Sequence, residues 1–215
     1  LQEFLLKKPD VVLISAYTMY YDITCEISKL CQQDGIPVII GGSAFVYQEI
    51  AALWHDIPGV TAVYAGEPET QLIPLIADVI KGNELNVYPG VYKAEQQSID
   101  IALPLLNLDK LPFPDFSDFP WHAYPNKVIP LMTGRGCEWD ICTFCSDVST
   151  ASGRSFRSRN IDNVIEEMRF QSTQFGSQLF VFLDLKLNSD LVLWRELIER
   201  IPKEFPNAQW TASVH

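Results

Sequence analysis

Three cysteines fall within nine residues of this chain, and thiols at that density can converge on one metal centre. Cys137, Cys142 and Cys145 follow the turn Gly134-Arg135-Gly136, which itself follows an apolar run. A loop of this size lets the three side chains turn inward together as thiolates. The spacing therefore predicts a metal or iron–sulfur site, and the function depends on which centre it holds.

Three kinds of site would use these thiols. Structural zinc takes four ligands, so zinc here would need His122 or a further cysteine. A disulfide with one free thiol needs an oxidising compartment, whereas five cysteines, three of them clustered, favour a reducing one. An iron–sulfur cluster on three thiolates leaves one iron open for a small-molecule ligand. We interpret Cys25 and Cys31, on an expected helix, as buried small hydrophobic residues.

Composition limits the class of protein. The 215 residues are 47% hydrophobic and carry 16 basic and 27 acidic side chains, a net charge of -11. This content can bury a core in one large or two small domains. The acidic balance argues against nucleic acid and anionic membrane as partners, and no apolar run suits a membrane span or a signal peptide. We expect a cytoplasmic protein and, because the chain lacks an initial Met and stops after an expected strand, an excerpt of a longer one.

The first part of the chain reads as three strand-helix units. Apolar strands are expected at 11–15, 37–40 and 60–64, with helices over 23–33, 50–54 and 72–80. Continuous apolar strands in this order predict an open parallel sheet with right-handed crossovers. Ligands of such sheets bind beyond the carboxyl ends of the strands. The candidate binding residues there are Ser15, Gly41, Gly42, Gly66 and Glu67, although turn glycines and a helix-opening acid would give the same pattern.

Residues 85–125 read as a linker. Segments 90–92 and 99–101 can pair as a hairpin, and the prolines of 111–116 exclude a helix. The linker aromatics are expected to anchor it on a neighbouring surface. They are Phe113, Phe116, Phe119 and Trp121.

Residues 126–215 repeat the strand-helix pattern. Strands are expected at 128–132, 179–183 and 209–214, and helices over 161–175 and 191–201. Asn160 is a plausible N-cap for the first helix, and Gly176 ends it. The cysteine loop follows the first strand and Asp184 ends the second, as in the opening units of a parallel α/β barrel.

The cysteine loop resembles that of the radical SAM superfamily, in which three cysteines follow the first barrel strand and an aromatic residue precedes the last. The usual spacing is CxxxCxxC, whereas this chain has CxxxxCxxC, which bears on the subfamily. The surrounding residues resemble the branch whose barrel follows a cobalamin-binding domain. They are Gly134-Arg135-Gly136-Cys137, Cys142-Thr143-Phe144-Cys145-Ser146, Ile40-Gly41-Gly42, Phe156-Arg157-Ser158-Arg159 and the stretches 9–15 and 65–69.

This resemblance implies an α/β fold with two partial domains. Residues 1–84 would be the C-terminal part of a Rossmann-like cobalamin-binding-type domain, 85–125 a linker, and 126–215 the N-terminal part of a TIM-type radical SAM barrel. The lower cobalt ligand of many corrinoid proteins comes from an Asp-x-His-x-x-Gly motif, which is absent from this sequence.

The resemblance also implies cofactors and a reaction. Cys137, Cys142 and Cys145 would bind a [4Fe-4S] cluster, S-adenosylmethionine would chelate the open iron, and cobalamin would lie between the domains. Phe144 would pack on the adenine, and Asp184 would contact the bound methionine or the substrate. The implied activity is reductive cleavage of S-adenosylmethionine by a cobalamin-dependent methyltransferase, which acts on a small molecule or peptide and takes electrons from an external donor.

Two other functions fit the same residues. One is a radical SAM enzyme of another reaction type with a vestigial corrinoid domain, and the other is a non-enzymatic α/β binding module stabilised by zinc. The position of the cysteines at the mouth of a barrel strand disfavours the zinc module, because chemistry is usual there.

Several side chains near the loop have open roles. Arg157 and Arg159 either close over a carboxylate or phosphate or are solvated charges before a helix. Trp139 and Asp140 are expected to shape the cysteine loop. His55 and His215 are expected to have surface or core roles.

Overall fold

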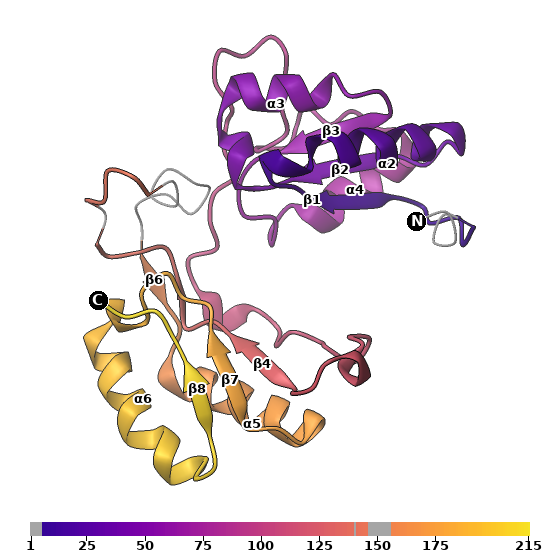
Figure 1. The fold of residues 1–215 in the computed structure, drawn as a ribbon. Coiled ribbons are helices and arrows are strands. Elements are labelled where there is room, and N and C mark those ends of the chain that lie inside the picture. The colour runs from indigo at the N-terminus through magenta and orange to yellow at the C-terminus, as the bar shows by residue number, and fades with distance from the viewer. Residues whose placement is uncertain (1–5, 140, 146–155) are drawn as a thin grey trace. The chain divides into compact units, whose positions relative to one another are not determined.

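The structure, a computed structural model, describes residues 6–139, 141–145 and 156–215. It divides into two compact units, and the boundary in the linker falls between Leu105 and Leu106. Each unit contains a three-stranded parallel sheet with helices along it (Figure 1). The predicted α/β class with parallel sheets is therefore confirmed. Among the described helices, none combines the length and apolar character that a transmembrane span requires.

The first unit has the strand order β1-β2-β3, with every pair parallel. Its elements are β1 (Val12–Ser15), α2 (Tyr21–Gln33), β2 (Val38–Gly41), α3 (Gln48–His55), β3 (Val60–Tyr64) and α4 (Leu72–Lys81), with 3-10 turns η1 (Thr18–Tyr20) and η2 (Ser43–Val46) after β1 and β2. All six strands and helices lie where the sequence predicts them. Pro74 falls in the first turn of α4, where a missing N–H is tolerated.

Alternate residues of the central strand serve two different cores. Val38 and Ile40 face the core that Trp54 of α3 and Cys31 of α2 complete. Ile39 faces the opposite core, with Leu75 of α4. Because β2 is covered on both faces, its side chains are continuously apolar rather than alternating, as in other parallel sheets. Cys31 is fully buried and Cys25 packs at the edge of the first core, as expected for small hydrophobic residues.

The two segments expected to form a hairpin each pair with the end of β3, and they are joined to each other by a hydrogen bond from the Gly90 N–H to the Asp100 carbonyl. Val91 bridges Tyr64 antiparallel, and Ala102 bridges Gly66. The backbone N–H of Ala65 donates to the carbonyl of Gly90 at 2.7 Å, and that of Tyr92 donates to Val63 at 2.9 Å. A free strand edge offers unpaired N–H and C=O groups along its whole length, so it competes well with a short local hairpin. The segments therefore cover the β3 edge of the sheet.

The second unit has the strand order β4-β7-β8, again parallel. Its main elements are β4 (Val128–Leu131), α5 (Ile161–Phe175), β7 (Leu179–Phe182), α6 (Leu191–Glu204) and β8 (Gln209–Thr211). The linker contributes the 3-10 turns η3 (Leu108–Lys110) and η4 (Trp121–Ala123), and η6 (Leu187–Ser189) follows β7. The predicted caps of α5 are confirmed, since the Asn160 side chain accepts from the N–H of Asp162 and Gly176 is left-handed with φ 62°.

Among the described residues, the packed core lies on one face of this second sheet. Ile129, Leu131, Phe180 and Phe182 pack with α5 and α6 in one core. The intervening apolar side chains are open on the other face. Those of Val128, Met132 and Leu183 are exposed. An open apolar sheet face of this kind marks a surface that a ligand or further structure covers.

The linker is fixed to the second unit by its aromatic residues, as predicted. Phe113 packs on Phe170 of α5 with ring centroids 5.8 Å apart, and Trp121 packs on Phe175 at 5.3 Å. The Gln171 amide donates to the carbonyl of Pro114 at 2.7 Å. The aromatic residues therefore serve as packing anchors for an otherwise irregular segment.

Candidate functional site

The cysteine loop begins at a short antiparallel pair that the sequence reasoning missed. β5 (Gly134–Arg135) pairs with β6 (Arg157–Ser158), with Gly134 opposite Ser158 and Arg135 opposite Arg157. A side chain on Gly134 would lie 2.7 Å from the carbonyl oxygen of Arg157, so the close approach of the two strands requires glycine there. The arginine-rich segment thus forms the base of the loop.

The three cysteines of the loop are in the thiol form and partly accessible. The Cys137 thiol lies 3.5 Å from the carbonyl oxygen of Trp139, and the N–H of Cys145 donates to the carbonyl of Cys142 at 3.4 Å. The second contact closes a turn that presents Cys142 and Cys145 together. Phe144, between them, is 90% exposed and open to a ligand.

Trp139 places the loop at the carboxyl ends of the second sheet. Its ring stacks on His215, beyond β8, with centroids 5.1 Å apart, and the Lys186 ammonium, beyond β7, lies 5.9 Å from the ring centre. Asn188 and His215 exchange two hydrogen bonds, which join the ends of these two strands. A cation over an aromatic face is attracted to the ring, so Lys186 stabilises the position of Trp139. Asp140, also expected to shape the loop, lies outside the described residues.

The donor set of the loop fits an iron–sulfur cluster in chemistry and number. Three thiols satisfy three irons of a cluster and leave the fourth open. Over residues 6–139, 141–145 and 156–215, no three Cys, His, Asp or Glu side chains are grouped tightly enough to hold a metal ion. His122, which zinc would need as a fourth ligand, lies in η4. The thiol count therefore favours a cluster over zinc.

Asp184 is buried at the carboxyl end of β7 and faces the start of the loop. Its Oδ1 accepts from the Thr133 N–H at 3.0 Å, the Thr133 hydroxyl at 2.7 Å and the Gly134 N–H at 2.8 Å. Burial raises the pKa of Asp184, although the hydrogen bonds from Thr133 and Gly134 act in the opposite direction. In this arrangement, Asp184 holds the chain that leads into the cysteine loop.

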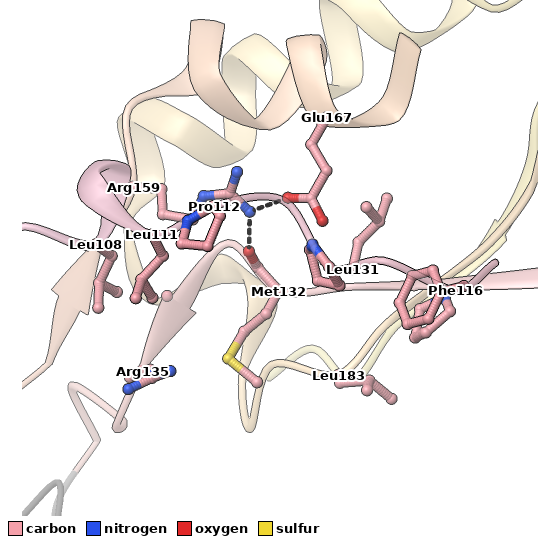
Figure 2. Close-up of a pocket in the computed structure, with 13 residues that line it drawn as sticks. Leu108, Leu111, Pro112, Phe116, Leu131, Met132, Arg135, Arg159, Glu167 and Leu183 are labelled. Atoms are coloured by element: carbon pink, nitrogen blue, oxygen red, sulfur yellow. Dashed lines mark hydrogen bonds and ion pairs between the residues drawn. The ribbon is translucent and has the colours of Figure 1, made fainter. Parts of the chain in front are cut away.

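Arg159 is neither a solvated charge nor open to a ligand. Its side chain is 11% exposed and forms an ion pair with Glu167 of α5, itself 3% exposed. The guanidinium also donates to the carbonyl of Met132 at 2.9 Å (Figure 2). It donates to the side chain of Asn163 at 2.6 Å as well. The carboxylate that Arg159 closes over is thus one of the protein's own. Glu167 escaped the sequence reasoning, although it shares the apolar helix face of Val164, Met168 and Gln171 at helical spacing.

A cavity of about 310 Å³ lies beside this ion pair within the second unit. Figure 2 shows Leu108, Leu111 and Pro112 of the linker on one side of it and Met132 and Leu183 of the sheet on another. Gly134 and Arg135 continue its wall to the start of the cysteine loop. The end of β4 therefore borders a hollow rather than a packed core.

The first unit brings four of the five predicted binding residues to one cavity. Ser15, Gly41, Gly42 and Gly66 line a space of about 330 Å³ at the carboxyl edge of the sheet, with Leu13, Tyr64 and Leu72 among the other lining residues. This volume is at the lower end of the range for small-molecule sites. The cavity is mostly apolar and would fit a compact aromatic group.

Glu67, the fifth predicted residue, does not line this cavity. Its buried carboxylate accepts from the backbone N–H of Leu105 at 3.2 Å, which ties down the end of the first unit. Exposed apolar side chains that the sequence reasoning missed follow β1. They are Tyr17, Met19 and Tyr20, and the signal was an aromatic-rich stretch directly after a parallel strand. His55 ends α3 and packs on Tyr92, without lining the cavity.

At two of the cavity glycines, the packing of the chain itself excludes a side chain. A side chain on Gly42 would lie 2.3 Å from the Ala16 carbonyl oxygen, and one on Gly66 would lie 2.8 Å from the Ala102 side chain. At Gly41 the nearest atom would be 3.8 Å away, an ordinary contact. Gly42 and Gly66 are thus required by the chain's own packing, whereas a side chain at Gly41 would fit without overlap.

These distances predict different outcomes for neighbouring substitutions. We expect Gly42→Ala to lower the free energy of unfolding by about 1–3 kcal/mol, since the backbone must shift to relieve the overlap. Gly41→Ala should change it by roughly 0.5 kcal/mol or less. Urea unfolding followed by circular dichroism measures both. Equal losses for the two variants would contradict this assignment of the glycines.

Comparisons with known proteins give methyltransferases. The sequence matches no family model. It is 28% identical to an uncharacterized methyltransferase of Pyrococcus horikoshii, over 95% of this chain and 46% of that protein. It is 29% identical to the bacteriochlorophyllide d C-12(1)-methyltransferase of Chlorobaculum tepidum, over 95% of this chain and 42% of that protein.

The fold matches solved structures of TsrM, a radical S-adenosylmethionine methyltransferase from Kitasatospora setae. The structure with tryptophan and a SAM analogue has a TM-score of 0.69 at 19% identity and covers 96% of this chain and 43% of that one. The structure with cobalamin and a [4Fe-4S] cluster has a TM-score of 0.67, also at 19% identity. The chain spans less than half the length of all these proteins. At this identity, the structural likeness establishes the α/β fold with parallel sheets.

Proposed function

We propose that this chain is part of a radical SAM enzyme and that Cys137, Cys142 and Cys145 bind a [4Fe-4S] cluster. The observation that carries the proposal is the position of three thiols in a loop whose Trp139 reaches the carboxyl ends of β7 and β8. Active sites of parallel α/β barrels lie at those strand ends. A bound cluster would supply the electron for reductive cleavage of S-adenosylmethionine.

The residues around the loop would bind and shield the reactants. Phe144 is exposed beside Cys145 and is available to pack on the adenine of S-adenosylmethionine. The open apolar face of the β4-β7-β8 sheet would line the interior of the barrel, where Met132 and Leu183 exclude water from the substrate. Asp184 would act on this site through the loop that it holds, rather than through contact with the methionine.

We further propose that the first unit binds cobalamin and that the reaction is methyl transfer to an unactivated carbon or phosphorus centre. The cavity at Ser15, Gly41 and Gly42 supports this, since it lies at the carboxyl edge of a parallel sheet, where ligands of such folds bind. The cavity would hold only a compact part of such a ligand, and the exposed rings of Tyr17 and Tyr20 offer apolar surface for the remainder. The methyltransferases among the relatives favour this reaction over other radical SAM chemistry. The substrate would be a small molecule or a peptide, with an external electron donor.

Anaerobic reconstitution with iron, sulfide and hydroxocobalamin tests the proposal. We expect about four irons per chain, the electron paramagnetic resonance signal of a reduced [4Fe-4S] cluster, and retention of cobalamin after desalting. If the protein took up iron but no cobalamin, the result would support a radical SAM enzyme of another reaction type instead of the methyltransferase. About one zinc with no iron would instead identify a zinc-stabilised binding module.

A further inference from the structure

The segment Met132–Gly134, which joins β4 to the cysteine loop, is held from two sides by residues distant in sequence. On one side, the N–H of Arg159 donates to the Thr133 carbonyl at 2.8 Å and its guanidinium donates to Met132. On the other side, Asp184 accepts from two backbone N–H groups and from the Thr133 hydroxyl. Every polar backbone group of Thr133 is therefore paired with a partner beyond its own strand.

Packing holds this segment on one side only, where a side chain on Gly134 would meet the Arg157 carbonyl. The cavity of about 310 Å³ runs along Met132 and Gly134, and Met132 is 39% exposed. β5 is only two residues long, so its pairing with β6 supplies few ladder bonds. Side chains that border a void lose part of their dispersion contacts. The hydrogen bonds of Arg159 and Asp184 must then determine the direction in which the chain leaves β4.

The loss of any one of these hydrogen bonds is costly because the groups that form them are buried. Thr133 is 2% exposed, and removing one partner from a buried donor costs the desolvation of that donor as well as the bond. Asp184 has no ion-pair partner among the described residues, so its carboxylate is satisfied by Thr133 and Gly134 themselves. The carboxylate and the loop entrance thus depend on each other.

We infer that Asp184 is a positioning residue for the cysteine loop, which acts through Thr133 and Gly134 to hold the loop in the conformation that binds the cluster. The part concerning the cluster rests on the proposed function. Asp184 touches none of the three cysteines in these contacts, and its effect is transmitted by the backbone of the loop entrance.

The variants are chosen to remove this contact without removing the fold. Asp184→Ala leaves two buried N–H groups unpaired and can fail to fold, so the primary variant is Thr133→Val, which deletes only the hydroxyl. Thr133→Ser keeps the hydroxyl and should restore wild-type behaviour. Gln171→Leu is the matched control, since it removes a buried hydrogen bond to Pro114 in the same unit and touches no residue of the loop.

Hydrogen exchange of the metal-free protein and iron release from the reconstituted protein are the two measurements. We expect Thr133→Val to speed exchange of the amides of 133–139 about tenfold, the effect of one lost buried hydrogen bond on local opening, while amides of α5 keep their rates. Loss of iron to a chelator, followed by visible absorption, should be faster by about the same factor. Thr133→Ser and Gln171→Leu should match the wild type in both measurements.

Two outcomes would overturn the inference. One is an amide exchange rate at 133–139 that rises no more in Thr133→Val than in Gln171→Leu. The contact of Asp184 would then contribute only to the overall stability of the unit. The other is faster exchange with an unchanged rate of iron release. If the wild type takes up no iron, the proposed function fails, whereas the exchange comparison still supports or overturns the role of Asp184 at the loop entrance.

Discussion

Replacement of any one of Cys137, Cys142 and Cys145 by Ala is expected to lower the iron content from about four per chain to less than one after anaerobic reconstitution. Three thiolates are the whole protein ligand set of such a cluster, so the loss of one leaves two irons without a protein ligand. Iron and acid-labile sulfide assays give the content directly. The electron paramagnetic resonance signal of the reduced protein should disappear in parallel.

Two control variants separate ligation from folding. Thr143→Ala changes an exposed side chain within the same turn, and Cys25→Ala removes a thiol on α2 of the first unit. Both should retain the wild-type iron content. A Cys142→Ala protein that still held about four irons, or a Cys25→Ala protein that lost them, would sink the ligand assignment.

Breaking the buried ion pair of Arg159 and Glu167 is expected to have the largest effect on stability. Glu167→Ala leaves the guanidinium buried without its carboxylate, and the loss of one partner from such a pair costs about 3–5 kcal/mol. The double variant Arg159→Met, Glu167→Leu should recover most of this loss, because a buried ion-pair site usually tolerates apolar residues of similar volume. Urea unfolding of the three proteins measures the free energies. Equal instability of the single and double variants would show that the pair is not the cause.

The same pair predicts a pH dependence. Burial raises the pKa of Glu167 above its ordinary value, although Arg159 acts in the opposite direction. A carboxyl group with a raised pKa binds its proton more tightly in the folded state than in the unfolded state. The protein therefore loses stability as the pH rises from the unfolded-state pKa through the folded-state pKa of that group. The wild type should therefore lose stability relative to Glu167→Gln across that window. A constant difference between the two proteins there would contradict the direction.

The sequence predicts elements well where the signal is local. The strands come from apolar runs without alternation, and the bounds of α5 follow from Asn160 and Gly176, whose capping roles need only the neighbouring residues. The clustering of the three cysteines is equally local. The carboxyl-edge cavity of the first unit also follows, because parallel strands end at one edge whatever the side chains.

Long-range partners could not be predicted from single stretches. Arg159 reads as a surface charge until Glu167 and Met132 are placed around it, and Asp184 reads as a ligand contact until Thr133 lies against it. The glycines mislead for a related reason. An absent side chain at Gly42 or Gly66 predicts room for a ligand, but the carbonyl of Ala16 and the side chain of Ala102 already fill that room.

The hold of Asp184 on Thr133 and Gly134 has a consequence for the order in which the protein matures. All three cysteines precede Asp184 in the chain, so a ribosome makes the thiols before it makes the residue that secures their loop. Domains fold as units during synthesis, with the N-terminal one first. The thiols therefore leave the ribosome without their anchor, and the proposed cluster would be assembled best after β7 has docked beside β4.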